Sequence, residues 1–154
     1  MPSAPIQVDP RGLRVSAALT AVVLAVVLLT ESSWLLAAQA VVFAVGAFAG
    51  VQRSPYSRLF VRLVRPRLGP PPATEDSRPP QFAQLVGLIF AVVGLVGFWA
   101  GLTILGLVAT GFALGAAFLN AALGLCLGCE VYLVIRRVLP GRVTGAVATT
   151  GHSA

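Results

Sequence analysis

The sequence contains few charged residues, two cysteines, one histidine and no lysine. Charged residues make up 10% of the chain, against roughly 25% in soluble globular domains, and 57% of the 154 residues are hydrophobic. This composition excludes a soluble domain. With only Cys126 and Cys129, a single chain can build neither a framework of several disulfides nor a four-ligand zinc site from cysteine.

Four apolar runs, 13–30, 34–51, 82–99 and 102–137, predict an all-α polytopic membrane protein. The second and third runs have eighteen residues each, which as helices span about 27 Å, close to the roughly 30 Å hydrocarbon core. We therefore expect four transmembrane helices in one domain over 1–139. The first run also resembles a signal peptide, but its best cleavage candidate, Ala38-Gln39-Ala40, lies inside the second run, which favours a retained span.

The last run poses a problem of length. A continuous helix over 102–137 would measure about 50 Å, too long for one perpendicular crossing. It must therefore tilt, break near Gly124 or Gly128, or protrude into the cytoplasm. The tail 140–154, which contains the only histidine, is predicted to be disordered.

All eleven positive charges are arginines, and their positions predict an orientation. Two precede the first run, six lie between the second and third, and three follow the fourth, whereas the connections 30–33 and 100–101 contain none. By the positive-inside rule, both termini and the loop 52–81 face the cytoplasm of an inner (plasma) membrane protein. In a chain this apolar, we expect the arginines to meet anionic lipid head groups and no nucleic acid.

The central loop has features of a short interfacial helix. Ser54-Pro55 is a typical helix start, and apolar residues then recur at helical spacing with arginines on the other side. Pro66 is expected to end this helix, and the prolines that follow predict an extended segment that returns Glu75 and Asp76 toward the arginines. A lipid-binding basic loop is the simpler interpretation, with an anion-binding pocket as the alternative.

Small and polar residues indicate how the helices pack. Glycines four apart let helix backbones approach closely in lipid, which favours internal packing and leaves a homodimer as the alternative. Gln39, Gln84 and Asn120 are expected to point into the bundle, through interhelical hydrogen bonds or along a substrate path. The glycine pairs are Gly46 with Gly50, Gly97 with Gly101, Gly111 with Gly115, and Gly124 with Gly128.

The most reactive side chains of the sequence are those of Cys126 and Cys129. Cysteines three apart share one helix face, and this pair is expected at the cytoplasmic interface, at the carboxyl end of the last helix. There the helix dipole opposes a thiolate while nearby arginines favour one. The motif is consistent with a reversible dithiol, with packing residues or with an intersubunit metal, and Glu130-Val131 after it excludes c-type haem attachment.

The chain resembles a family of small actinobacterial integral membrane proteins known as a domain of unknown function. The resemblance covers residues 9 to about 137. It is carried by Asp9-Pro10-Arg11-Gly12, Gln39-Ala40, Ser54-Pro55-Tyr56, Arg65-Pro66-Arg67-Leu68-Gly69-Pro70, Glu75-Asp76, Phe82-Ala83-Gln84, Phe118-Leu119-Asn120-Ala121 and Cys126-Leu127-Gly128-Cys129-Glu130-Val131-Tyr132. It implies four membrane helices and genes near thioredoxin-like and sulfurtransferase proteins, but no established reaction.

These observations favour a thiol redox or sulfur relay protein, in which Cys126 and Cys129 react with a thioredoxin-like or rhodanese-like cytoplasmic partner. In this hypothesis Arg65, Arg67 and Arg78 hold an anionic sulfur compound and Glu130 transfers a proton. No cofactor and no metal are predicted. The alternatives are a non-catalytic membrane scaffold or complex subunit, and a small transporter of sulfur oxyanions.

Overall fold

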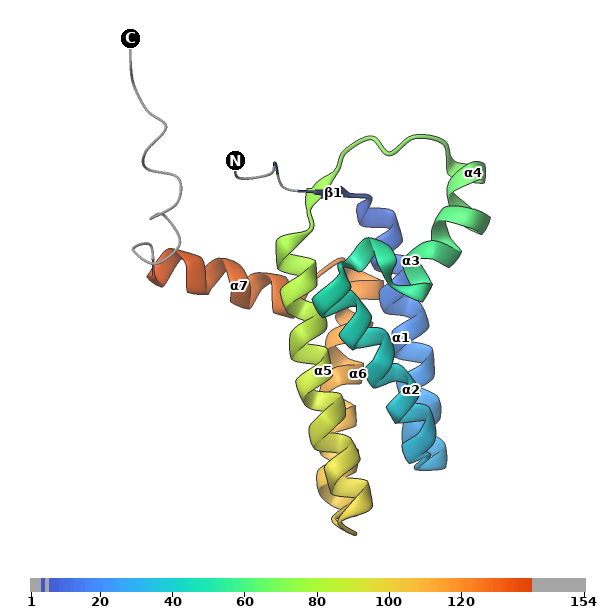
Figure 1. The fold of residues 1–154 in the computed structure, drawn as a ribbon, viewed down its shortest axis with the longest axis vertical. Coiled ribbons are helices and arrows are strands. Elements are labelled where there is room, and N and C mark those ends of the chain that lie inside the picture. Colours follow the sequence, from blue (N-terminus) through green and yellow to red (C-terminus); the bar gives the residue numbers. More distant parts are fainter. Residues whose placement is uncertain (1–3, 5, 140–154) are drawn as a thin grey trace.

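The computed structural model describes residue 4 and residues 6–139. Within these residues, the main body is a helical bundle whose segments run side by side (Figure 1). The segments are α1 (Pro10–Thr30), α2 (Ser33–Ala44) continued by the π-helical turn η1 (Val45–Ala49), α5 (Arg78–Trp99) and α6 (Thr103–Leu123). α1 packs on α6 and α2, and α5 packs on α2 and α6. The predicted all-α membrane fold is confirmed at this level.

Among the described residues, three helices are long and apolar enough to cross a membrane. These are α1, α5 and α6, with 21, 22 and 21 residues. The second apolar run forms a shorter helical segment of 12 α-helical and 5 π-helical residues. It ends at Gly50, whose φ of 102° lies in the region that only glycine enters freely.

The core lies where α2, α5 and α6 meet α1. Leu24, Val27, Leu36 and Ala91 have no exposed surface, and Phe43 is 5% exposed. Leucine, valine and phenylalanine side chains that face inward here fill the space between helices, while the opposite faces expose apolar side chains suited to lipid. The bundle is therefore packed as a membrane domain is, with an apolar interior and an apolar exterior.

Glycines permit close approach at only some of the expected positions. A Cβ on Gly97 would lie 2.6 Å from the backbone nitrogen of Gly106, so α5 and α6 touch through their main chains there. In contrast, a Cβ on Gly111 or Gly115 would meet no atom within 4 Å. The expectation of internal packing through Gly111 and Gly115 was therefore wrong, because this face of α6 points away from the other helices that the structure describes.

The central loop is helical for longer than expected. It comprises η2 (Val51–Arg53), α3 (Pro55–Leu59), the π-helical turn η3 (Phe60–Val64) and α4 (Arg65–Leu68). Pro66 does not end the helix, contrary to expectation. Pro66 lies in the first turn of α4, which follows the π-helical turn η3, and a proline is tolerated in a first turn because its missing N–H is not needed there. The helix ends instead at Gly69, which has a φ of 69°.

The amino terminus is attached to this loop. β1 (Gln7–Val8) pairs antiparallel with β2 (Glu75–Asp76). The Arg11 guanidinium bonds Asp9 at 3.0 Å and the carbonyl oxygen of Gly69 at 3.0 Å. The carboxylates of the second half of the loop thus return to the amino terminus, and the pairing with residues 7–8 was not expected.

The last apolar run is divided. α6 ends at Leu123, Gly124 takes a left-handed conformation with a φ of 70°, and α7 (Leu127–Val138) begins three residues later. Figure 1 shows α7 leaving the bundle sideways, across the direction of the other helices. The expected helix over 102–137 is thus two helices with a break at Gly124, one of the two positions where the run could break. The predicted disorder of 140–154 lies outside the described residues.

Candidate functional site

Cys126 and Cys129 are joined by a disulfide. Their Cα atoms are 5.1 Å apart, within the usual range for bonded cysteines. Both residues are half-buried. The sequence spacing thus brings the two sulfur atoms together, as a reversible dithiol requires.

The cysteines lie at the amino end of α7, because the chain breaks before them. Gly124 ends α6, and Cys126 then has the extended conformation of a helix N-cap, with φ −85° and ψ 99°. Its Sγ accepts a hydrogen bond from the backbone N–H of Cys129 at 3.4 Å. The expected position at the carboxyl end of a helix was therefore wrong, and the sign of the dipole effect reverses: free N–H groups and the positive end of the dipole face Cys126.

Gly128 fixes α7 against the bundle. A Cβ at this position would lie 2.5 Å from the Cβ and 2.6 Å from the Cα of Ala83 on α5. Only a glycine next to a small residue allows this approach. One turn further, the rings of Tyr132 and Phe82 lie 5.7 Å apart. The contact between α7 and α5 therefore holds the cysteine pair at the end of the bundle.

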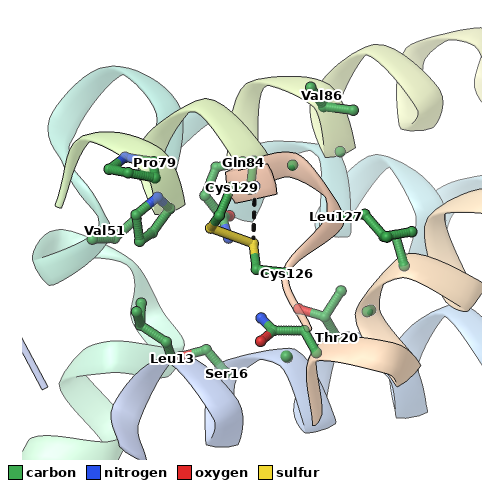
Figure 2. A pocket seen from close by; sticks show the side chains of 18 of the residues that line it. Leu13, Ser16, Thr20, Val51, Pro79, Gln84, Val86, Cys126, Leu127 and Cys129 are labelled. Carbon is green, nitrogen blue, oxygen red and sulfur yellow. Dashed lines mark hydrogen bonds between the residues drawn. A yellow bond between two sulfur atoms is a disulfide. The ribbon is translucent and has the colours of Figure 1, made fainter. Parts of the chain in front are cut away.

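The disulfide lines a cavity of about 760 Å³. Figure 2 shows the disulfide between Gln84 on one side and Leu13 and Ser16 of α1 on the other. Further apolar walls come from α5 and α6 and include Phe90, Phe112, Ala113, Ala116 and Ala117. The volume is in the range of small-molecule sites, roughly 300–1,000 Å³.

Residues with hydroxyl or amide groups line the cavity from α1, α3, α5 and α6. Ser16 and Thr20 of α1, Gln84 of α5 and Asn120 of α6 all line it, and the buried Oγ of Ser16 has no hydrogen-bond partner. The expectation that Gln84 and Asn120 point into the bundle agrees with their place in this lining. Sequence reasoning missed Ser16 and Thr20, although two polar residues four apart on an apolar helix share one face and signal such a lining.

Arg14 is the second feature that sequence reasoning missed. Its guanidinium donates to the carbonyl oxygens of Ala121 and Ala122, each at 3.3 Å. These carbonyls belong to the last turn of α6, where helical partners are lacking, so Arg14 caps the helix that ends before the cysteine pair. Arg14 also lines the cavity, as do Glu75, Asp76 and Glu130. The charged part of the lining is thus one arginine with three carboxylates.

Of the other predicted site residues, Glu130 follows Cys129 directly, whereas the three arginines lie apart from the cysteines. Glu130, in the first turn of α7, is exposed and close to the pair in sequence. Arg65 and Arg67 are on α4 and Arg78 begins α5, and none of the three lines the cavity. The backbone N–H of Arg78 donates to Asp76 at 2.9 Å. Their role as an anion site stays a prediction. In the described part of the chain, no three His, Cys, Asp or Glu side chains are grouped to hold a metal.

Polar contacts hold the central loop and the amino terminus in place. The hydroxyl of Tyr56 on α3 donates to Oε1 of Gln39 at 2.7 Å, and burial raises the pKa of Tyr56. Gln39 is 1% exposed, so the expected inward position and its hydrogen bond are confirmed, although its Nε2 has no partner. The hydrogen bond from the Arg11 side chain, together with that residue's backbone N–H and charge, lowers the pKa of Asp9 despite partial burial.

The fold and the site define an apolar helical protein of the membrane, with a cysteine pair at a helix amino terminus beside a cavity. The chain belongs to the family described as a domain of unknown function, DUF4395, whose family model matches residues 8–137. The resemblance inferred from the sequence motifs to an uncharacterised domain family is thus confirmed. Searches of curated proteins and of solved structures give no match.

Proposed function

We propose that the protein is a membrane thiol redox protein that exchanges electrons between Cys126/Cys129 and a thioredoxin-like protein in the cytoplasm. The observation that carries this proposal is the disulfide at the amino end of α7, where Cys126 is the N-cap. A helix amino terminus stabilises a thiolate, and the thiolate is the attacking species in thiol–disulfide exchange. A pair of cysteines that served only for packing has no need of this position.

The exchange balances in two steps. With the pair reduced, the Cys126 thiolate attacks one sulfur of the partner's disulfide, forming a mixed disulfide and releasing one partner thiolate. The Cys129 thiolate then attacks the Cys126 sulfur, restoring the Cys126–Cys129 disulfide and releasing the second partner thiolate. Two electrons pass to the partner, and two protons follow. The reverse sequence reduces this protein. Glu130, exposed in the first turn of α7, is available to pass protons to water.

The same pair suits a sulfur relay with a rhodanese-like partner. The Cys126 thiolate takes the outer sulfur of the partner's persulfide and releases the partner thiolate. The Cys129 thiolate then attacks the Cys126 sulfur, forming the Cys126–Cys129 disulfide and releasing hydrosulfide. The anionic sulfur compounds that Arg65, Arg67 and Arg78 were expected to hold are less suited to the cavity. Three carboxylates line the cavity beside one arginine, and their negative charges repel an anion. This charge balance favours electron exchange over a transporter of sulfur oxyanions.

The proposed topology places four helices across the plasma membrane with both termini in the cytoplasm. α1, α5 and α6 are of membrane length, and the 17 residues Ser33–Ala49 supply the fourth crossing with about 25 Å of helix. All arginines precede the first crossing, lie between the second and third, or follow the fourth. They are therefore on one side of the proposed membrane, which supports a cytoplasmic cysteine pair. α7, with Arg136 and Arg137 beside exposed apolar side chains, then lies in the membrane interface together with the loop helices.

Partner trapping tests the redox proposal and assigns the two cysteines. Cys129→Ser leaves the attacking thiol without its resolving thiol, so this variant should accumulate a mixed disulfide with its partner on non-reducing gels. Cys126→Ser should trap far less, because the remaining thiol lacks the N-cap position. Mass spectrometry of the adduct distinguishes a thioredoxin-like from a rhodanese-like partner. Equal membrane abundance of both variants, with no adduct in either, would favour the non-catalytic scaffold.

A further inference from the structure

The cavity beside the disulfide has two chemically different ends. Arg14, Asn120 and Glu130 line it near the cysteines, whereas Phe90 and Phe112 line it further along α5 and α6. From Ala83, which contacts Gly128, to Phe90 is seven residues of helix, about 10 Å. A molecule that fits this lining has a polar head beside the sulfur atoms and an apolar extension toward the middle of the bundle.

The apolar end borders the lipid. Phe112 stands halfway along a helix of membrane length, lines the cavity and is 65% exposed. Its ring stacks with that of Phe90, with centroids 6.1 Å apart. In the membrane, the surface exposed at this position faces acyl chains, not water. A ligand of this cavity can therefore reach it from the bilayer.

The polar end offers groups that bind neutral oxygen atoms. The buried Oγ of Ser16 lacks a partner, and Thr20, 6% exposed, lies one turn further on the same face of α1. Hydroxyl groups donate hydrogen bonds to carbonyl oxygens. The three carboxylates of the lining disfavour an anionic head group, so a neutral head group with carbonyl oxygens fits best.

We propose that this cavity binds a membrane quinone and that the reduced Cys126/Cys129 pair passes two electrons to it. The inference rests on the proposed thiol exchange, which it extends by naming the electron acceptor. A quinone combines the required features: a flat neutral ring with two carbonyl oxygens, an apolar isoprenoid tail and the capacity to accept two electrons. The protein thereby joins a cytoplasmic thiol donor to the quinone pool.

The electron transfer balances without a further reactant. The Cys126 thiolate adds to the quinone ring, forming a carbon–sulfur bond and moving an electron pair onto a ring oxygen. The Cys129 thiolate then attacks the Cys126 sulfur, so the sulfur–sulfur bond forms, the carbon–sulfur bond breaks and its electron pair remains on the ring. The two protons that the thiols lose end on the two ring oxygens. Two thiols and one quinone give one disulfide and one quinol.

The test uses the full chain, reduced in lipid nanodiscs and freed of reductant. Decylubiquinone, which carries a ten-carbon tail, is compared with the same benzoquinone ring without a tail. We expect one quinol for each disulfide formed. The rate should saturate with the concentration of decylubiquinone and depend much more weakly on the concentration of the ring alone. Equal, non-saturating rates for both quinones would mean ordinary thiol oxidation in solution and would overturn the quinone site.

A pair of variants checks that the cavity itself is used. Ala117→Phe fills the cavity wall, and we expect it to slow quinone reduction at least about tenfold. Val108→Phe is the matched control, because Val108 is on the same helix, is 50% exposed and does not line the cavity. If Ala117→Phe does not fold, the comparison of tailed and tail-free quinone on the unmodified protein decides. Equal slowing in both folded variants contradicts the site.

A second assay on the same samples separates this inference from the proposed thiol exchange. Each preparation is exposed to dithiothreitol and then to oxidised thioredoxin, and the thiol state is read by alkylation gel shift. Normal exchange without any quinone reduction would overturn the quinone site and leave the thiol exchange standing. A pair that neither dithiothreitol nor thioredoxin nor quinone converts would overturn both.

Discussion

The two ends of α5 are each held by a glycine contact, but the contacts have different consequences. At the end near Trp99, the backbones of Gly97 and Gly106 meet in a stretch without charged residues. At the other end, Ala83 contacts Gly128 next to a cavity that is lined by a disulfide, an arginine and three carboxylates. The first contact packs one span on another, whereas the second positions reactive atoms. The same small-residue packing thus serves stability at one end and chemistry at the other.

The largest change in stability is expected at the Gly97 end. In Gly97→Ala the new Cβ overlaps the backbone of Gly106, which cannot rotate away as a side chain can, so α5 and α6 must separate. The free energy of unfolding should fall by roughly 1–3 kcal/mol. Unfolding in mixed detergent micelles measures it, with Gly111→Ala as control because its Cβ meets nothing. Reoxidation of the cysteine pair should be unchanged in both variants.

Gly128→Ala should show the opposite pattern. The new methyl group displaces α7 from Ala83, and α7 contributes no buried residue, so the bundle loses little stability. The cysteine pair moves with α7, and thiol exchange with thioredoxin should slow about tenfold, equivalent to about 1.4 kcal/mol. Gly115→Ala, whose Cβ also meets nothing, is the control. A large loss of stability with normal thiol exchange would contradict the proposed difference between the two ends of α5.

Tyr56→Phe asks whether polar contacts at the cysteine end also stabilise the fold. Without the Tyr56 hydroxyl, the buried Oε1 of Gln39 loses the hydrogen bond that it accepts from this hydroxyl. The Nε2 of the same amide already lacks a partner. The loss should be roughly 1 kcal/mol of unfolding free energy. Tyr132→Phe removes the same hydroxyl from a ring that packs on Phe82 and provides the comparison. Equal effects would mean that the Gln39 bond contributes nothing.

The smallest effect is expected from Asp9→Asn, and it depends on pH. The pKa of Asp9 is lowered by Arg11, so the charged carboxylate stabilises the fold above the unfolded value of about 3.9. This contribution should be lost as pH falls from about 4 through the folded pKa. Asparagine keeps the N-cap but not the charge, and should cost less than about 1 kcal/mol at pH 7. Unfolding curves of both proteins should converge at low pH, and a constant difference contradicts this role.

Much of the bundle could be predicted from the sequence because apolar run length and arginine position are strong signals in lipid. A break near Gly124 or Gly128 was one of three solutions for the length of the last run, but the sequence could not choose among them. Glycines are common inside membrane helices, so Gly124 gives no sign that it takes a left-handed conformation. The break is accompanied by the contact of Gly128 with Ala83, more than forty residues away in sequence. Because the cysteines were placed on one unbroken helix, they were expected at its carboxyl end and not at the amino end of a new helix.

The candidate site was predicted only in part for a related reason. Cys126 and Cys129 stand out by spacing alone, and the structure joins them. Arg14 was assigned to lipid head groups because charge and position at the start of a span suggested nothing else, whereas it caps α6 through Ala121 and Ala122. Such partners, over a hundred residues apart, are set by the packing of α1 on α6, which no local pattern encodes.

The thiol state of Cys126 and Cys129 in intact cells tests the central claim, that the pair is a working redox couple. Cells are quenched with acid, the thiols are alkylated with a mass tag, and the two forms are separated on a gel with Cys126→Ser and Cys129→Ser as markers. Both the dithiol and the disulfide should be found, and their ratio should shift within minutes of adding a thiol oxidant or reductant. A single form that no treatment changes would contradict a redox function.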